Sequence, residues 1–222
     1  MSLLDGAYAR LDRIEAKHAE FRERGDEWVN SPDGKALSQR YIEQRATGLP
    51  NKREQIAADV PPILSIIAGE AIYNLRSALD YLAYELVFLS KGAYFEKSQF
   101  PIDDDPAKIP RFSAETLARL RPCDRTAIET LQPYNGCKWT SKLRDLSNPD
   151  KHRRLTTFGV EMGVRFRLVS ATDRHVDRDT VFTIGFDGLR PVAEILDRLT
   201  ANVADVLDAF KPEFEAQRKR QG

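Results

Sequence analysis

The chain has 222 residues, of which 41% are hydrophobic, which suits one folded domain rather than a disordered chain. Its 34 basic and 34 acidic side chains cancel, so attraction of the whole molecule to nucleic acid or to an anionic membrane is not expected. No apolar stretch suits a bilayer span, and the first residues lack the pattern of a signal peptide. Two cysteines, Cys123 and Cys137, without metal-site spacing predict reduced thiols in the cytoplasm.

Residues 1–60 are predicted to hold two helices. Apolar side chains recur every three or four residues from Leu4 to Phe21, and charged residues fill the other faces. This seam is narrow, as in a helix that packs on one neighbour or pairs with another chain, so a homodimer is one predicted assembly. His18 lies on the seam, where we expect it to pack between helices. A second, more polar helix is predicted over residues 35–47.

The most informative segment is a long helix predicted to begin after Pro61-Pro62 and to stop at Gly92. One face is broadly apolar, and the other carries three tyrosines among polar residues. Because tyrosine joins an apolar ring to one polar tip, we expect another element to cover that face as well, which makes this helix central. Arg76 and Asp80, four residues apart, are expected to pair along it. The residues of the polar face are Glu70, Tyr73, Asn74, Arg76, Ser77, Asp80, Tyr81 and Tyr84.

Shorter elements follow the long helix. Short helices are predicted to start at Ser113, Asp124 and Trp139, and the last of them is expected to end at Asn148-Pro149, because proline disfavours helix in the residue before it. Alternation of apolar and polar residues then predicts a β-hairpin.

The predicted fold is a mainly helical α+β domain that spans residues 1–222. It is a helical bundle around the long helix of a 61–154 core. A small antiparallel β-hairpin (155–190) precedes a C-terminal helix and tail (191–222).

The most concentrated polar run lies between Arg144 and Arg154. His152 can titrate near neutrality, and the neighbouring cations disfavour its charged form, which favours its action as a base. A nearby arginine, Arg153 or Arg144, could hold a phosphate by bidentate hydrogen bonds. These are the groups that metal-independent cleavage of RNA requires.

The same run also fits a structural role. Asn148 and Asp150 could cap a turn while Lys151 and Arg153 pair with acids on the long helix. A buried polar network would then fix how the long helix meets the neighbouring loop. The candidate binding or network residues are Glu70, Asn74, Arg76, Asp80, Asn148, Asp150 and Lys151.

Charge is unevenly distributed along the chain. Between Lys138 and Arg178 there are ten Lys/Arg and five Asp/Glu, an excess that predicts a phosphate-binding or RNA-binding surface. The alternative is a docking site for the acidic loop at Asp103–Asp105. Cysteine and histidine pairs lack the short spacing of zinc ligands, and no glycine-rich phosphate loop is present, so neither a metal nor a cofactor is expected.

Four motifs resemble those of a family of uncharacterised bacterial and phage proteins. They follow in this order: Leu75-Arg-Ser-Ala-Leu-Asp80, Phe100-Pro-Ile102, Leu131-Gln-Pro-Tyr134 and Asn148-Pro-Asp-Lys-His-Arg153. The similarity covers about residues 60 to 160. Because that family carries no established activity, the resemblance implies a class of protein and no function.

A looser resemblance is to the HEPN superfamily, helical domains that include RNases of toxin and phage-defence systems. Such domains are often dimeric and place an arginine and a histidine at the dimer cleft. The resemblance implies His152 as the base, Arg153 and Arg144 as phosphate-binding cations, and Asp80 and Arg76 as orienting partners. Seven residues separate Arg144 from His152, a longer spacing than HEPN domains use.

Two functions remain open at this point. One is a non-catalytic binding, scaffold or regulatory protein of a bacterial or phage system, with a protein partner. The alternative is a HEPN-like, metal-independent ribonuclease. The two differ in accessibility, because a nuclease needs His152 and a cation to face a cleft, whereas a structural network would bury both.

Overall fold

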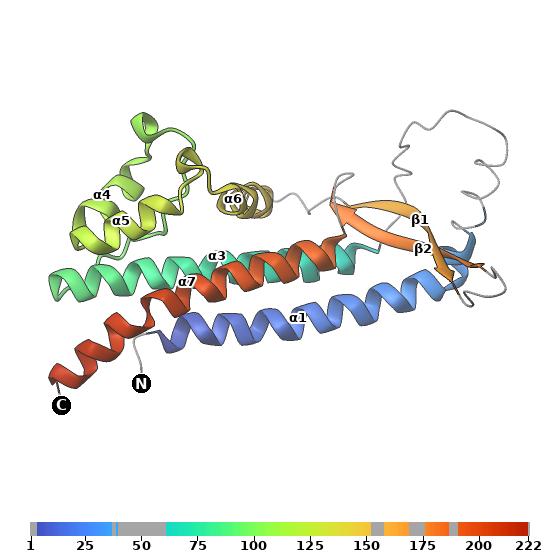
Figure 1. Ribbon diagram of the computed structural model, residues 1–222, viewed down its shortest axis with the longest axis horizontal. Helices are drawn as coiled ribbons and strands as arrows, with labels where there is room; N and C mark the ends of the chain where they lie inside the picture. The colour runs from blue at the N-terminus through green and yellow to red at the C-terminus, as the bar shows by residue number, and fades with distance from the viewer. Residues whose placement is uncertain are drawn as a thin grey trace.

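The computed structural model describes residues 4–36, 39, 61–151, 158–168, 176–186 and 191–221, and this part of the chain is mostly helical (Figure 1). The mainly helical class predicted from the sequence is therefore confirmed. The helices are α1 (Asp5–Asn30), α3 (Pro62–Lys91), α4 (Arg111–Arg119), α5 (Pro122–Thr130), α6 (Lys138–Lys151) and α7 (Val192–Gln221), with the 3-10 helices η1 (Pro106–Lys108) and η2 (Pro133–Asn135). In the described ranges, no helix combines the length and the apolar content needed to cross a bilayer.

Two strands lie between α6 and α7 in the sequence. They are β1 (Phe158–Leu168) and β2 (Val176–Phe186), which pair antiparallel. In this register Phe158 lies opposite Phe186 and Leu168 lies opposite Val176. Most of the helix predicted at 35–47 falls outside the described residues.

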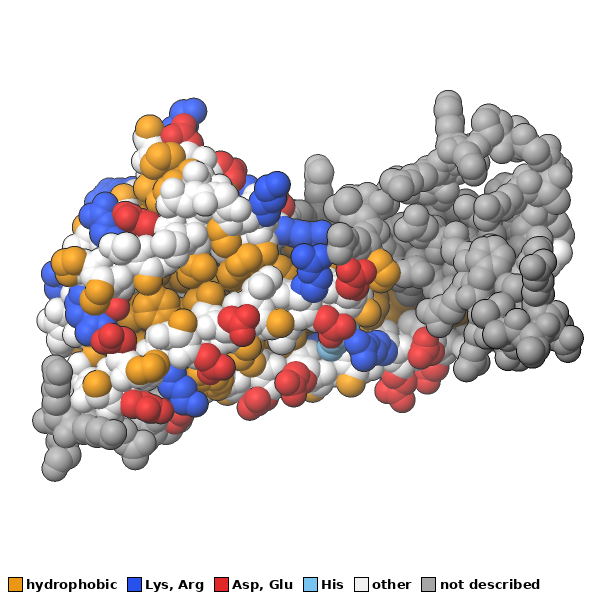
Figure 2. Space-filling model, in the orientation of Figure 1, with side chains coloured by type: hydrophobic (Ala, Val, Ile, Leu, Met, Phe, Trp, Pro, Cys, Tyr) orange, Lys and Arg blue, Asp and Glu red, His pale blue; other side chains and the backbone are white. Residues whose placement is uncertain are grey.

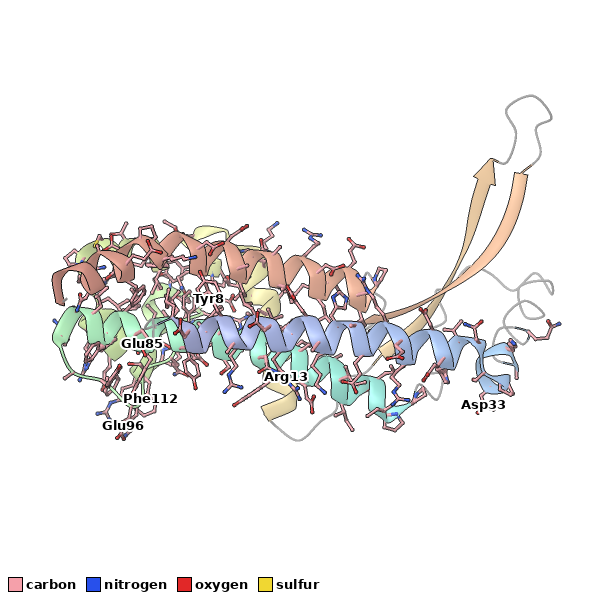
Figure 3. The ribbon with its side chains drawn as sticks, turned by 90° about the horizontal axis from the view of Figure 1, so that it is seen from below. Tyr8, Arg13, Asp33, Glu85, Glu96 and Phe112 are labelled. Carbon is pink, nitrogen blue, oxygen red and sulfur yellow. The ribbon has the colours of Figure 1, made fainter. Side chains whose placement is uncertain are left out.

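Three long helices, α1, α3 and α7, lie side by side as a bundle (Figures 1 and 3). α3 and α7 run in the same direction and α1 runs against both, so the two chain ends lie at one end of the bundle. The apolar seam of α1 contributes Leu11, Ile14 and Phe21 to the core. The seam thus packs on two helices of its own chain, and the expectation that it pairs with another chain is wrong for this face, because α3 and α7 already cover it.

Polar contacts join α1 to α7 along their length. The Tyr8 hydroxyl donates to Asp208 at 2.6 Å, and Arg22 lies 3.0 Å from the carboxylate of Asp197. His18 Nδ1 lies 3.0 Å from the same carboxylate, and the His18 side chain is only 12% exposed. The prediction that His18 packs between helices is confirmed. Burial lowers the pKa of His18, although attraction to Asp197 acts in the opposite direction.

Both predicted ends of α3 are confirmed. The helix begins at Pro62, where proline lacks only an N–H that would have no helical partner. It ends at Gly92, whose φ of 67° lies in the left-handed region that favours glycine. Its buried residues occupy most of its circumference, from Leu64 to Val87, as expected for a central helix.

The expectation that another element covers the tyrosines of α3 is wrong for two of the three. Tyr73 is 53% exposed and Tyr81 is 39% exposed, whereas Tyr84 is half-buried and stacks on Tyr94 with ring centroids 4.4 Å apart. The physical reason is that α1, α7 and the shorter helices pack on the other faces of α3. Among the described elements, none covers the strip of α3 that carries Tyr73 and Tyr81.

Helices α4, α5 and α6 form a lobe on the bundle, in which α4 and α6 pack against α3 (Figure 1). Two predicted helix ends in this lobe are wrong. α4 begins at Arg111, and Ser113 is buried inside its first turn rather than capping it. α6 continues through Pro149 to Lys151, because a proline near a helix end removes only one backbone hydrogen bond.

Candidate functional site

Arg76 and Asp80 of α3 hold the backbone of the loop that follows α3. The predicted pair is confirmed, with Arg76 Nη2 lying 3.2 Å from Asp80 Oδ1. The same guanidinium donates to the carbonyl of Phe100, and the N–H of Phe100 donates to Asp80 Oδ1 at 2.8 Å. Arg76 is only 8% exposed, so its charge is balanced inside the protein. The pair therefore fixes how α3 meets the Phe100-Pro-Ile102 motif.

Gln132 and Thr116 hold the same loop from the side of the lobe. Gln132 Nε2 donates to the carbonyl of Pro101 at 2.8 Å, and its Oε1 accepts from the N–H of Asp103 at 3.1 Å. Gln132 is 1% exposed, and Thr116 Oγ1 accepts from the N–H of Gln99 at 3.4 Å. Polar side chains from three parts of the chain thus satisfy the backbone groups of one buried loop.

Arg144 of α6 is held by acidic side chains. Its guanidinium lies 2.7 Å from Asp104 and 2.8 Å from Asp145, and it also donates to Ser141 at 3.2 Å. At Arg144, the basic segment therefore binds the acidic loop Asp103–Asp105, which was the predicted alternative to a phosphate-binding surface. Burial alone would lower the pKa of Arg144, but the hydrogen bonds to the two aspartates outweigh it and raise the pKa.

Asp103 is the most buried carboxylate of the acidic loop, at 9% exposure. Burial raises its pKa, while attraction to Arg144 and Arg76 acts in the opposite direction. Asp103 Oδ2 and Arg76 Nε are both buried without a hydrogen-bond partner among the described residues. The carboxylate therefore lies in a polar but incompletely satisfied part of the interior.

The predicted catalytic histidine, His152, and the cation Arg153 lie outside the described residues. Asn148, Asp150 and Lys151 belong to the last turn of α6, and only their backbone is described. Most of the basic surface expected between 138 and 178 also falls outside the described side chains. Of the three candidate catalytic residues, Arg144 alone is placed, and it pairs with aspartates.

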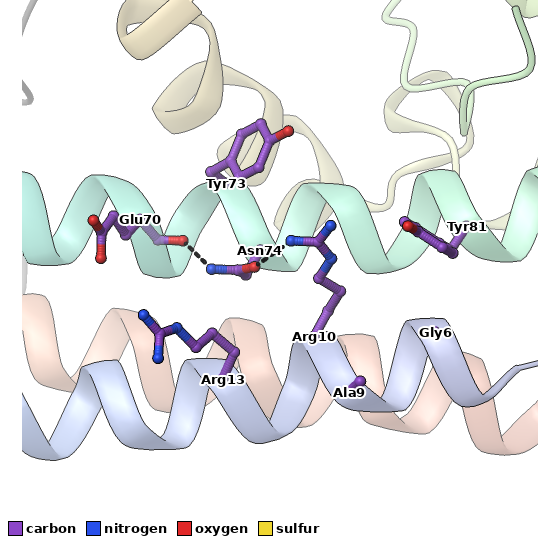
Figure 4. A pocket seen from close by; sticks show the side chains of 8 residues that line it. All are labelled: Gly6, Ala9, Arg10, Arg13, Glu70, Tyr73, Asn74 and Tyr81. Carbon is purple, nitrogen blue, oxygen red and sulfur yellow. Dashed lines mark hydrogen bonds between the residues drawn. The ribbon is translucent and has the colours of Figure 1, made fainter.

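Glu70 and Asn74 lie apart from that loop, in a groove of about 680 Å³ between α1 and α3 (Figure 4). In the groove, Arg10 of α1 donates to Asn74 Oδ1 at 3.1 Å and lies 5.5 Å from the ring centroid of Tyr81. Asn74 in turn donates to the carbonyl of Glu70 at 2.8 Å. The predicted network is therefore divided, with Arg76 and Asp80 at the loop and Glu70 and Asn74 at the groove.

Two of the residues that line the groove are small. Gly6 and Ala9 of α1 lie at one end, and a Cβ atom on Gly6 would lie 2.8 Å from the Tyr81 ring. Glycine therefore allows the ring to approach the backbone of α1 closely. Tyr73 stands out from α3 on the side away from α1 (Figure 4).

The charges in the groove are of both signs. Lys17 of α1 is neutralised by Glu70 at 2.6 Å and by Glu20 at 2.9 Å. Arg10 contacts only neutral groups there, and Arg13 forms no ion pair with any residue that the structure describes. The groove thus presents, beside one carboxylate, two guanidinium groups that form no ion pair with the described residues, although Arg13 is attracted to Glu20.

Exposed apolar side chains extend the groove along α3. Six large hydrophobic side chains are exposed in the described part of the chain, and four of them are on this helix: Ile63, Ile66, Tyr73 and Tyr81. Their spacing places them on one strip of α3, and no other helix among the described residues covers it. Exposed apolar side chains gathered in one strip are typical of an interaction surface.

A second hollow, of about 330 Å³, lies between the lobe and α7 on the face drawn in Figure 2. Trp139 and Leu131 line it from the lobe, and Val206 and Phe210 line it from α7. Val206 and Phe210 are nearly fully buried. This hollow is smaller than the α1–α3 groove, and its lining includes no cation.

Sequence reasoning did not single out Gln132, Arg10 or Arg13. Gln132 belongs to the Leu131-Gln-Pro-Tyr134 motif, so a search for buried polar groups within the motifs would have found it. Arg10 and Arg13 have no such signal, because a charged position on the polar face of an amphipathic helix ordinarily faces solvent.

Comparison of the chain with family models, with curated proteins and with solved structures finds no match in any of the three. Within the described ranges, histidine, cysteine, aspartate and glutamate side chains do not gather in groups of three or more that could ligate a metal ion. The case for a function therefore depends on the geometry of the loop network and of the α1–α3 groove.

Proposed function

We propose that this protein is a non-catalytic binding or scaffold protein that docks a protein partner in the α1–α3 groove. On the motif resemblance, we propose that it acts as a scaffold or regulator of a bacterial or phage system. One observation carries the proposal: a strip of exposed apolar side chains on α3 borders a groove that contains two arginines without an ion pair among the described residues. Tyrosine and arginine are the residues that most often dominate the energy of protein interfaces.

The described candidate residues Arg76, Asp80 and Arg144 support binding over catalysis because each already forms an ion pair within the protein. Arg76 and Asp80 hold the backbone of Phe100, and Arg144 pairs with Asp104 and Asp145. A phosphate at Arg144 would have to displace two carboxylates. Groups engaged in this way stabilise the fold and are poorly placed to bind a substrate.

The charge of the groove supports a protein partner over RNA. Nucleic acid draws most of its affinity from several cations that contact phosphates together. The groove lining has two arginines and one glutamate, and the nearby Lys17 is already neutralised. Ile63 and Ile66 can bury apolar surface against a protein but cannot stack on bases as an aromatic ring does.

Site-specific cross-linking in the native cell tests this proposal. Benzoylphenylalanine replaces Tyr73 in the groove, and the matched control carries it in place of Phe112, an exposed aromatic residue of α4. We expect protein adducts from position 73 and not from position 112. Adducts to RNA alone, or equal adducts from both positions, would contradict a protein-binding groove.

The competing hypothesis, a HEPN-like ribonuclease with His152 as base and Arg153 and Arg144 as cations, is tested by incubating wild type and His152→Ala with RNA in EDTA. A non-catalytic protein leaves the RNA intact in both reactions. Cleavage by wild type alone, with matching melting temperatures, would establish the nuclease and overturn the proposal.

A further inference from the structure

We infer that the partner in the α1–α3 groove presents an acidic amphipathic α-helix of about 18 residues, which packs along the exposed strip of α3. The inference rests on the proposed function and names the element of the partner that the groove binds. Two observations carry it: the spacing of the exposed side chains of α3, and the charge on the neighbouring side of α1.

The exposed side chains of α3 follow the spacing at which one helix packs on another. Between positions 63 and 81, the exposed residues are Ile63, Ile66, Glu70, Tyr73 and Tyr81. At 100° per residue, all five fall within about 80° of the helix circumference. The first four are separated by three, four and three positions, which is the spacing of a coiled-coil seam.

Four of these five side chains are apolar or aromatic although the strip meets solvent, where a helix ordinarily presents polar residues. Ile63 is 44% exposed and Ile66 is 43% exposed. No other helix among the described residues covers them. Anchors spaced in this way fit the apolar face of a second helix, which repeats with the same period, better than they fit an extended segment.

The length of the strip sets the length of the partner helix. Ile63 and Tyr81 are 18 positions apart on α3, which is about 27 Å at 1.5 Å per residue. Glu70 is the charged residue of the strip, and Lys17 lies 2.6 Å from its carboxylate, so its charge is balanced within the chain. A single polar position within an apolar seam fixes the register of two packed helices.

The side of α1 next to the strip carries three cations. Arg10, Arg13 and Lys17 recur at spacings of three and four, so they share one face of α1. Lys17 is paired with Glu70 and Glu20. Arg10 contacts only neutral groups in the groove, and Arg13 forms no ion pair with a described residue. Attraction to Arg13 is the smallest of the effects on the pKa of Glu20, so the charge of Arg13 stays largely unbalanced.

These two arginines determine the charge of the partner. Both side chains are turned toward α3 (Figure 4). A helix that packs on the strip therefore turns one of its flanks toward Arg10 and Arg13. Asp or Glu on that flank would pair with the two guanidinium groups, whereas Lys or Arg there would be repelled.

A displayed library of amphipathic peptides tests this chemistry on the purified full chain. Each peptide has about 20 residues, with apolar residues at the seam positions and with Glu, Gln or Lys varied independently on the two flanks. We expect selection on wild type to enrich peptides that carry Glu on one flank. The best of them, made synthetically, should bind less tightly at high salt. Enrichment of Gln or Lys on both flanks, or no enrichment over an empty support, overturns the inference.

Three variants test where the selected peptide binds. Arg13→Glu should weaken its binding about threefold or more, and should favour a twin peptide with Lys in place of Glu on that flank. The matched control Arg198→Glu, at an exposed arginine of α7, should leave both affinities unchanged. Tyr73→Ser should weaken the binding of both peptides. Melting curves check the fold of each variant. Equal effects of Arg13→Glu and Arg198→Glu, or full affinity in Tyr73→Ser, overturn the inference.

Mapping the cross-link formed by benzoylphenylalanine at position 73 separates failure of this inference from failure of the proposed function. An adduct in a partner segment with apolar residues every three or four positions and Asp or Glu beside them supports the acidic helix. An adduct in a segment without that pattern, or to a second copy of this chain, overturns the inference and leaves the binding function standing. An absence of any protein adduct overturns both.

Discussion

Replacing Gln132 by methionine tests whether the loop network stabilises the fold. Methionine has a similar length and volume but can replace none of the hydrogen bonds of the amide. The Gln132 side chain makes three hydrogen bonds to buried backbone groups, with the carbonyls of Pro101 and Ile128 and with the N–H of Asp103. All three backbone groups would lose their side-chain partner, and none of them would gain water in exchange.

The expected loss of stability follows from the number of hydrogen bonds removed. A hydrogen bond inside a protein contributes about 1 kcal/mol net, so the change should remove about 3 kcal/mol of stability. For a chain of this length, each kcal/mol lowers the melting temperature by roughly 2–4 °C, which gives a fall of roughly 6–12 °C. In urea, the midpoint should fall while the slope of the transition stays the same.

Calorimetry or circular dichroism measures the effect against a matched control. Thr126→Val in α5 removes one exposed hydrogen bond, from Thr126 to the carbonyl of Pro122, and should change stability by less than ~0.5 kcal/mol. A Gln132→Met melting temperature within roughly 2 °C of wild type would refute the reasoning. The loop would then be held by apolar packing of Phe100 and Ile102 rather than by its polar contacts.

Three further predictions concern charged groups. Arg144→Gln should lower the melting temperature by no more than roughly 4 °C, because the carboxylates of Asp104 and Asp145 are more than half exposed. The fall should be smaller at high salt. A larger fall would mean that these ion pairs anchor the acidic loop. The pKa of His18 is lowered by burial, so the folded state binds fewer protons than the unfolded state. The free energy of unfolding is therefore highest above about pH 6.5 and falls as the pH drops and His18 must be protonated on unfolding. His18→Gln should flatten the acid limb of a plot of melting temperature against pH. Burial raises the pKa of Asp103, so its charged form destabilises the folded state at neutral pH, whereas its protonated form does not. Asp103→Asn should therefore raise the melting temperature at pH 7 and change it little at pH 3. A lower melting temperature of the variant at pH 7 would contradict this.

Local chemistry decided which parts of the fold were predictable. The ends of α3 follow from Pro62 and Gly92, whose backbone preferences act within one turn, and the Arg76–Asp80 pair follows from helix geometry alone. The end of α6 was predicted wrongly because the preference against helix before Pro149 is small enough for the surroundings to override.

The candidate site depended on contacts that no local pattern encodes. Arg144 was assigned to phosphate binding because its neighbours in sequence are basic, but its partner Asp104 is 40 positions away in the chain. The tyrosines of α3 were expected to be covered because periodicity gives the composition of a face and not the element that packs on it. Arg10 lies in the groove because α1 packs beside Tyr81 of α3, a tertiary contact that the sequence of α1 does not encode.

The sequence distances spanned by the contacts have a consequence for the order of folding. The side chains that hold the Phe100–Asp103 loop lie 20 to 31 positions from the backbone groups they bind, whereas Arg22 and Tyr8 reach across 175 and 200 positions to α7. Because near contacts form with a smaller loss of chain entropy, α3 and the lobe should assemble first. The docking of α1 and α7 on each other should then be the last step to form and the first to open. Hydrogen exchange in mild denaturant would show this as amides of α1 that exchange at a lower free energy than those in the middle of α3.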